Sequence, residues 1–381
     1  MKYLSIIFAL VLLFSCTNRK NKDVKKRTVK IEEAKAYVFS DIFDSLTIYP
    51  LETNDSSLIT EIDKVIFSDG QIFILDKRQL SVVTFDSFGK FVSRLRKIGR
   101  GPDEYVGIED FTFDSRKGNL ILLNWCTLKT YGLDGRLLEQ FHINEKGIKA
   151  LNRFEIINDD LMAFLRYHED EGLVLYSRNQ KKILETKHIV PKWTRNKIPF
   201  NSLNPFFNNS GDIVYIEGFS NKIYKIDENG CNLKYEWDFP GKNFNYDILK
   251  SQIESISSIN KIEDQISFYL KNYVLGFNYN CENETWIITN CMSEGSQLTI
   301  LFNKKTTKSV IIKGNLSMLF SSNVYLDKNN QIFTIVDPRT LKYLPQNWFS
   351  EEVKSTIDNI DVMDNPVVLK FSIKNDGYKH N

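Results

Sequence analysis

The sequence predicts an all-β fold, a six-bladed β-propeller with two short helical insertions. Three observations predict it: a sheet motif that recurs along the chain, a chain length that suits six copies, and terminal strands that can close a ring. Gly89 and Gly135 occupy matching places in two consecutive copies, 46 residues apart (135 − 89). A period of this length is typical of propellers, in which each copy forms one sheet of four strands.

Each copy has an apolar, β-branched run, a turn, a second run and a polar turn that contains Asp, Asn or Gly. The first copy includes residues 70–76 and 83–91, and the second includes 118–124 and 130–137. Later copies start near residues 173, 212, 285 and 323. Six copies of about 46 residues fill roughly 276 of the 345 positions that follow residue 36 (381 − 36).

Two segments depart from the β pattern. Residues 246–270 carry apolar side chains at spacings of three and four, which predicts an amphipathic helix. Ser350 is a candidate N-cap for a second helix, with acids in its first turn and Val353, Ile357 and Ile360 on one face. We expect both helices to be insertions at the rim of a blade.

The two ends of the folded region are expected to share the last blade. Residues 366–373 form an apolar run near the C-terminus, and residues 45–51 form an early strand. Pro50 lies near the end of that early strand and suits an outer edge, where a missing N–H leaves no bond unmade. A shared blade would close the ring.

The N-terminus predicts export and a lipid anchor. Lys2 precedes an apolar run at 6–14, which is shorter than the roughly 20 residues that span a bilayer. Leu13, Phe14, Ser15 and Cys16 resemble a bacterial lipoprotein cleavage box, so we expect lipidation of Cys16. An ordinary secretory signal with a chance cysteine is the alternative. The expected division is a signal peptide at 1–15, a lipidated cysteine and basic flexible tether at 16–40, and the propeller at 41–381.

Charge distinguishes the expected tether from the propeller. Residues 17–36 hold eight basic and three acidic side chains, a net of +5, and predict a disordered segment. This segment either contacts anionic lipid headgroups or is a solvated linker. Subtracting it and Lys2 from the chain's +2 leaves −4 for the remainder, which argues against a nucleic-acid partner.

Cysteine and histidine usage predicts no metal site and no cofactor. There is no Cys-x-x-Cys motif, and the histidines, among them His142, His168 and His188, are scattered. Residues 285–290 between Cys281 and Cys291 are expected to form a strand of roughly 20 Å, too long for a disulfide that needs Cα atoms within about 7 Å. The redox state of Cys126 and Cys231 stays open.

The loop at 98–105 is the candidate binding site. Gly99 and Gly101 permit unusual backbone conformations and Pro102 stiffens the turn. In a propeller such a blade-to-blade connection crosses one face toward the central channel, so its polar side chains could form a rim for a sugar or carboxylate. The alternative is structural, with Arg100 and Glu104 bridging neighbouring blades. The candidate binding residues are Arg100, Asp103, Glu104 and Tyr105.

Several of these segments together carry a family resemblance. Residues 44–53 and 57–59, the strand at 72–76, the loop at 99–105 and the closing run at 364–369 resemble the six-bladed β-propeller lipoproteins of Bacteroidetes. The resemblance extends from about residue 40 to the C-terminus. It implies a propeller related to NHL-repeat proteins, lipid-anchored at the cell envelope, and it implies no particular ligand. The basic residues after Cys16 favour a periplasm-facing protein over a surface-displayed one, and the expected location is the outer membrane.

The favoured function is a non-enzymatic binding or scaffold module for a glycan, a peptide or an envelope protein. No catalytic residue is assigned, because no nucleophile elbow and no phosphate-binding loop is present. A metal-assisted lyase or hydrolase acting at the channel mouth is the alternative. A structural subunit of a larger envelope complex is a third possibility and would show a broad apolar patch.

Overall fold

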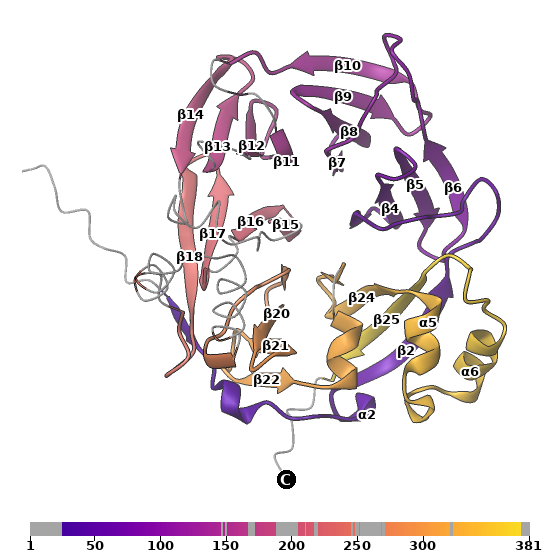
Figure 1. Cartoon of the computed structure of the whole chain (residues 1–381), viewed down its shortest axis with the longest axis vertical. Coiled ribbons are helices and arrows are strands. Elements are labelled where there is room, and N and C mark those ends of the chain that lie inside the picture. The colour runs from indigo at the N-terminus through magenta and orange to yellow at the C-terminus, as the bar shows by residue number, and fades with distance from the viewer. Residues whose placement is uncertain are drawn as a thin grey trace, which may run out of the picture.

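Six sheets stand around a common axis, which confirms the predicted six-bladed propeller (Figure 1). The computed structural model describes residues 25–374, apart from 146–147, 149–150, 167–171, 188–204, 210, 217–219, 245–246, 248–250, 252–267, 269–270 and 321–322. The predicted signal peptide and the first part of the tether lie outside the described residues.

Each blade runs from an inner strand at the channel to an outer strand at the rim. Blades 1 and 2 contain β3 (Lys64–Ser68), β4 (Gln71–Asp76), β5 (Ser81–Asp86), β6 (Phe91–Leu95), β7 (Asp110–Asp114), β8 (Asn119–Asn124), β9 (Thr127–Gly132) and β10 (Leu137–His142). Blades 3 and 4 contain β11 (Leu151–Ile156), β12 (Leu161–Arg166), β13 (Gly172–Ser177), β14 (Lys182–Lys187), β15 (Phe206–Asn209), β16 (Asp212–Ile216), β17 (Lys222–Asp227) and β18 (Gly230–Asp238). Blade 5 contains β19 (Asn280–Glu282), β20 (Trp286–Ser293), β21 (Ser296–Asn303) and β22 (Ser309–Ile312).

Blade 6 joins the two ends of the fold, as predicted. Its strands are β23 (Tyr325–Leu326), β24 (Gln331–Val336), β25 (Val367–Ile373) and, at the outer edge, β2 (Phe43–Pro50). β2 pairs antiparallel with β25, so a strand from the N-terminal region completes a sheet of C-terminal strands. Asn365, just before β25, accepts a hydrogen bond from the Ile59 backbone N–H (2.8 Å) and donates to the Glu52 carbonyl (2.8 Å), which secures the closure.

The core is divided among the blade interfaces. Side chains alternate along a strand, so Ile72 and Ile74 pack toward blade 6 while Phe73 and Leu75 pack toward blade 2. One apolar cluster fills each of the interfaces between neighbouring blades. Both faces of a central strand are therefore buried, which explains the unbroken apolar runs of the repeats.

The predicted tether is wrong from residue 25 onward. β1 (Lys26–Thr28) pairs in parallel with β18 at the rim of blade 4, and Lys35 forms a bridge with Ile312 at the rim of blade 5. The 3-10 helix η2 (Ile31–Glu33) and helix α2 (Phe39–Ile42) complete the path to β2 in blade 6 (Figure 1). Residues 25–50 thus form a strap along the rims of three blades. We refer to this segment as the N-terminal strap.

Buried side chains explain why the strap docks despite its charge. Val29 and Ile31 are buried in the interface of blades 4 and 5. Arg27 is 6% exposed, and its guanidinium lies 4.3 Å from the ring centre of Tyr235 and 5.0 Å from that of Phe302. The net charge of this segment could not predict these contacts, because a buried arginine and a solvated lysine contribute the same charge.

The helix predicted after Ser350 is confirmed. It is α6 (Glu351–Asp358), and the Val353 N–H donates to the Ser350 hydroxyl at its N-terminus (3.3 Å). α5 (Pro338–Tyr343), η4 (Asn315–Phe320) and η5 (Gln346–Trp348) also lie beside blade 6 or blade 5. The predicted helix at 246–270 lies largely outside the described residues, although Asp247, Ser251 and Phe268 within it are helical. Among the described helices, none has the length and apolar character that crossing a membrane requires.

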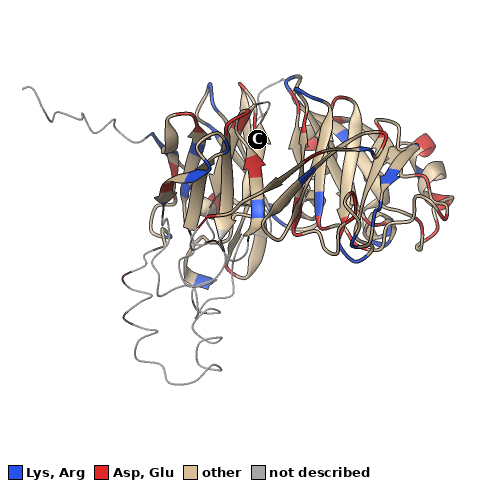
Figure 2. Cartoon of the chain, turned by 90° about the horizontal axis from the view of Figure 1, so that it is seen from above, with Lys and Arg blue, Asp and Glu red and all other residues tan. Residues whose placement is uncertain are grey.

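Seen edge-on, the molecule carries its charged residues mainly at the turns of its two faces, and both signs occur on each face (Figure 2). The strands between them are largely uncharged.

Candidate functional site: the channel pocket

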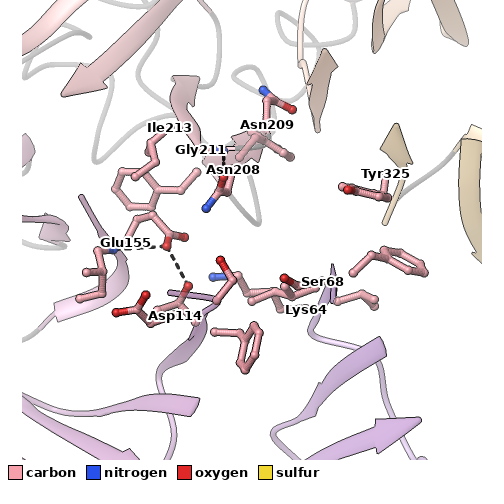
Figure 3. Close-up of a pocket in the computed structure, with 18 of the residues that line it drawn as sticks. Lys64, Ser68, Asp114, Glu155, Asn208, Asn209, Gly211, Ile213 and Tyr325 are labelled. Atoms are coloured by element: carbon pink, nitrogen blue, oxygen red, sulfur yellow. Dashed lines mark hydrogen bonds between the residues drawn. The ribbon is translucent and has the colours of Figure 1, made fainter. Parts of the chain in front are cut away.

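A cavity of about 460 Å³ lies in the central channel, toward the ends of the inner strands (Figure 3). All six blades contribute to its lining, including Lys64, Asp114, Glu155, Asn208, Cys281 and Tyr325. Small-molecule sites commonly have volumes of roughly 300–1,000 Å³ and few converging polar groups. The size and the mixed lining of this cavity fit that description.

The channel-side edge of each inner strand pairs with no other described strand, so its backbone N–H and C=O groups need other partners. Side chains from neighbouring blades bond to some of these groups. Lys64 Nζ donates to the Phe111 carbonyl (2.8 Å), and Asp110 accepts from the Phe154 N–H (3.0 Å). Between blades 4 and 5, Asn209 accepts from the Glu282 N–H (3.1 Å). These contacts join neighbouring blades and make the channel wall polar.

A buried ion pair lies at the inner end of the cavity. Lys64 Nζ is 3.1 Å from Asp110 Oδ1, and the side chains are 6% and 1% exposed. The ammonium has acceptors on both Asp110 oxygens and on Phe111 O, so its donors are all used. The pair is electrically neutral and joins blades 1 and 2.

Glu155 is a second buried acid beside this pair. Its Oε1 accepts from the Thr112 hydroxyl (2.8 Å) and from the Ile156 N–H (3.2 Å). Burial is the largest cause that raises the pKa of Glu155, and Asp110 raises it further, while Lys64 and Thr112 oppose the shift. Glu155 thus lines the cavity as an acid whose charge is incompletely compensated.

Toward the mouth the cavity becomes aromatic and amphipathic. Phe67 and Tyr325 stack with ring centres 5.6 Å apart, and Tyr325 lies on the side of the cavity opposite Glu155 (Figure 3). Asp114 is paired with Arg116 at 2.9 Å. Asn208 accepts from the Gly211 N–H (2.8 Å), which shapes a turn at the rim.

A separate ion cluster ties blade 4 to blade 5. Glu282, whose side chain is 3% exposed, lies 2.6 Å from Lys234 and 2.7 Å from Lys304. Lys234 also reaches Asp212 (3.3 Å). Glu282 is therefore held between two lysines, and we assign the cluster a structural role.

The candidate residues of the 98–105 loop have different environments. Tyr105 is 1% exposed, and its hydroxyl donates to the carbonyls of Leu80 (3.1 Å) and Leu95 (3.3 Å); burial raises its pKa to about 12. Glu104 accepts from the Gly101 N–H (2.7 Å) within the loop. The Tyr105 ring thus belongs to the core between blades 1 and 2.

The other two candidates lie nearer the surface. Asp103 pairs with Lys97 (2.7 Å), which is the largest cause of the lowered pKa of that carboxyl. Arg100 is exposed and forms no hydrogen bond or ion pair with any residue that the structure describes. This loop is separate from the channel pocket, and a binding role for Arg100, Asp103, Glu104 and Tyr105 stays a prediction.

The cysteine prediction is confirmed where it was specific. Cys281 and Cys291 are free, and Trp286–Ser293 is a strand, as the argument required. Cys126 and Cys231 are also free. His142 lies on β10 within 3.0 Å of the Thr127 hydroxyl, whereas His168 and His188 fall outside the described residues. Within the described ranges, no group of His, Cys, Asp or Glu is arranged to hold a metal ion.

Sequence reasoning missed the channel residues. Lys64 and Asp110 are 46 positions apart (110 − 64), which is the repeat spacing itself. A charged residue at the start of two successive inner strands was therefore the available signal. It was overlooked because the inner strands are short and less apolar than the central ones.

Comparison with known proteins identifies the family. A family model described as a domain of unknown function, DUF4934, matches residues 24–372. The chain belongs to this family. Its first matched residue agrees with the start of the strap, so the strap is part of the DUF4934 domain.

Solved structures of two Bacteroides proteins are similar to this DUF4934 chain. One is described as a "Putative exported protein" from Bacteroides fragilis NCTC 9343, with a TM-score of 0.72, 16% identity, and coverage of 92% of this chain and 100% of that chain. The other is a member of the DUF4221 family from Bacteroides vulgatus ATCC 8482, with a TM-score of 0.54, 10% identity, and coverage of 87% and 98%. The TM-scores show a shared fold, and at these low identities the likeness shows the fold alone. A search of curated proteins gave no significant match.

Proposed function

We propose that this DUF4934 protein is a lipid-anchored, non-catalytic binding propeller of the bacterial cell envelope, with the channel pocket as its ligand site. The observation that carries the proposal is the cavity of about 460 Å³ on the axis, lined from all six blades. A scaffold that needed only its outer surface would gain nothing from a polar cavity, since buried polar groups cost free energy unless they are satisfied.

The chemistry of the lining supports binding over catalysis. Lys64 and Asp114 are each held in an ion pair, and Glu155 Oε1 is held by two hydrogen bonds. Groups that are fixed in this way are suited to orienting a ligand. Metal-assisted chemistry at the channel mouth is the competing function. A stoichiometric metal retained by the purified protein would support that competing function and contradict ours.

The envelope location rests on the N-terminus and on a structural relative. The segment Leu13-Phe14-Ser15-Cys16 suits lipidation of Cys16, and the similar B. fragilis protein is described as exported. The relation to NHL-repeat proteins and the placement in the outer membrane facing the periplasm belong to the same proposal. Mass spectrometry of the mature N-terminus should find an acylated Cys16, and a Cys16→Ala variant should lose the modification and leave the membrane fraction. An unmodified N-terminus at any other residue would contradict the anchor.

The ligand site can be tested by blocking the pocket. Ser68 lines the cavity, so Ser68→Trp should fill its mouth with little effect on the blade cores. Glycan and short-peptide libraries are screened against the wild type, and any ligand found is measured with Ser68→Trp and Arg100→Ala. We expect Ser68→Trp to abolish binding and Arg100→Ala to leave it unchanged. The reverse result would move the site to the 98–105 loop.

A further inference from the structure

We propose that the channel pocket recognises an organic ammonium group, with the Glu155 carboxylate as its counter-ion. The inference rests on the proposed binding function and adds the chemical class of the ligand. Three observations carry it: the free oxygen of Glu155, the charge balance of the cavity, and the aromatic wall on the opposite side.

Glu155 presents one oxygen to the cavity. The residue is 5% exposed, and both of its hydrogen bonds, from Thr112 and from the Ile156 N–H, end on Oε1. Its Oε2 has no hydrogen-bond or ion-pair partner among the residues that the structure describes. A buried carboxylate with an unused oxygen favours a ligand that donates a charge-assisted hydrogen bond.

The charge balance favours a cation. The lining contains Lys64 and Arg116 against Asp69, Asp114 and Glu155. Asp110 neutralises Lys64, and Asp114 neutralises Arg116. Glu155 is then the one buried charge among the described lining residues that forms no ion pair, while Asp69 is exposed. An anionic ligand would meet this excess of negative charge, whereas a cation would relieve it.

The shape and the walls favour an organic cation over a metal ion. One carboxylate oxygen cannot complete the shell of six or more oxygens that Ca²⁺ takes. Tyr325 lies across the cavity from Glu155 and stacks on Phe67, and Phe206 and Phe207 also line the cavity. Aromatic faces accept the apolar body of a small amine and attract its charge. An amino sugar and a lysine side chain both present this chemistry.

Proton linkage gives the inference a second readout. Burial, and to a lesser extent Asp110, raise the pKa of Glu155 against the opposing effects of Lys64, Thr112 and the Ile156 N–H, so this acid takes up its proton at a higher pH than an exposed glutamate does. An ammonium ligand binds the ionised form. Its affinity should therefore rise with pH through the pKa of Glu155, and binding should release a proton.

Matched probe pairs test the inference by titration calorimetry on the full-length protein. Glucosamine is compared with N-acetylglucosamine, and Nα-acetyl-lysine amide is compared with its Nε-acetylated form. In at least one pair the free amine should bind at least tenfold more tightly than its acetylated partner. The pair that does so distinguishes the amino sugar from the lysine side chain.

Variants assign the effect to Glu155. Glu155→Gln should weaken binding of the amine at least tenfold, leave the acetylated probe within about threefold, and remove the pH dependence. Thr112→Val should move the pH dependence upward, because it removes a hydrogen bond that favours the ionised acid. Glu351→Gln, on the exposed surface of α6 and outside the cavity lining, is the matched control and should change affinity less than about threefold.

The failures are distinguishable. Equal binding of amine and acetylated probes, or unchanged binding by Glu155→Gln, would overturn the ammonium inference. If no amine binds but a library ligand is lost in Ser68→Trp, the inference is wrong and the proposed binding function stands. If no ligand responds to Ser68→Trp, both are wrong.

Discussion

Replacing Asp110 with alanine tests whether the channel ion pair holds the ring together. The substitution removes the acceptors for Lys64 Nζ at 3.1 and 3.3 Å and the acceptor for the Phe154 N–H at 3.0 Å. It leaves a Lys64 side chain that is 6% exposed with one acceptor, Phe111 O. Breaking a buried pair from one side typically costs about 3–5 kcal/mol, because the remaining charge is uncompensated. We expect the free energy of unfolding to fall by that amount.

Urea denaturation of the purified protein measures the change, through the midpoint at an unchanged slope. The double variant Lys64→Met with Asp110→Leu removes both charges, so it should lose clearly less than the sum of the two single variants. Asp103→Ala breaks the exposed Lys97 pair and is the matched control, for which a much smaller effect is expected. A loss below about 1 kcal/mol for Asp110→Ala, or additive losses in the double variant, would refute the reasoning.

Four further outcomes are expected. Arg27→Ala should weaken the N-terminal strap by about 2 kcal/mol and speed tryptic cleavage at Lys30 and Lys35; equally fast cleavage of the wild type would show a free segment instead. Gly89→Ala should destabilise the protein by at least about 1 kcal/mol, since Gly89 has φ +82° and an added Cβ would lie 2.5 Å from Pro50 O; a neutral change in midpoint would contradict this. The protonated Glu155 stabilises the folded state fully below about pH 4.3, the usual pKa of an unfolded glutamate, and this stabilisation is lost as pH rises through the raised pKa of the folded state. The free energy of unfolding of Glu155→Gln should therefore improve relative to that of the wild type over this pH range. A difference between the two proteins that does not change with pH would contradict the raised pKa. Native thiol labelling should spare three buried cysteines, and reductant should leave the melting temperature unchanged; rapid labelling would disprove the burial of Cys231, Cys281 and Cys291.

The central strands were predictable because both of their faces are buried. Ile72 to Leu75 supply two interfaces at once, and such runs repeat visibly along the sequence. The pairing of β2 with β25, which closes the ring, was predictable in the same way. The apolar runs near the two chain ends belong to no other repeat, so each needed the other as its partner. Period and hydrophobicity were sufficient for the architecture.

The channel pocket was not predictable by the same means. Its walls are the inner strands, whose free edges face the axis, so polar residues such as Lys64 and Glu155 interrupt their apolar pattern. The sequence predicts Tyr105 as a binding residue because it is polar and lies in a loop, yet its ring is packed in the core and its hydroxyl is bonded to backbone carbonyls. Residue type alone does not distinguish a polar group that awaits a ligand from one that is already satisfied.

The strap also changes what an anchor at Cys16 would do. A tether over residues 17–40 would reach about 84 Å at roughly 3.5 Å per residue, whereas docking from Lys25 leaves only residues 17–24 and a reach of about 28 Å. The attachment point then lies at the rim of blade 4, where β1 pairs with β18, and not on either face of the ring (Figure 1). A lipid at Cys16 would therefore hold the propeller close to the membrane by its edge. Since the pocket lies in the central channel and not at the rim, this arrangement leaves it accessible to a small soluble ligand. Weakening the strap with Arg27→Ala should change the distance from the membrane without changing affinity for that ligand.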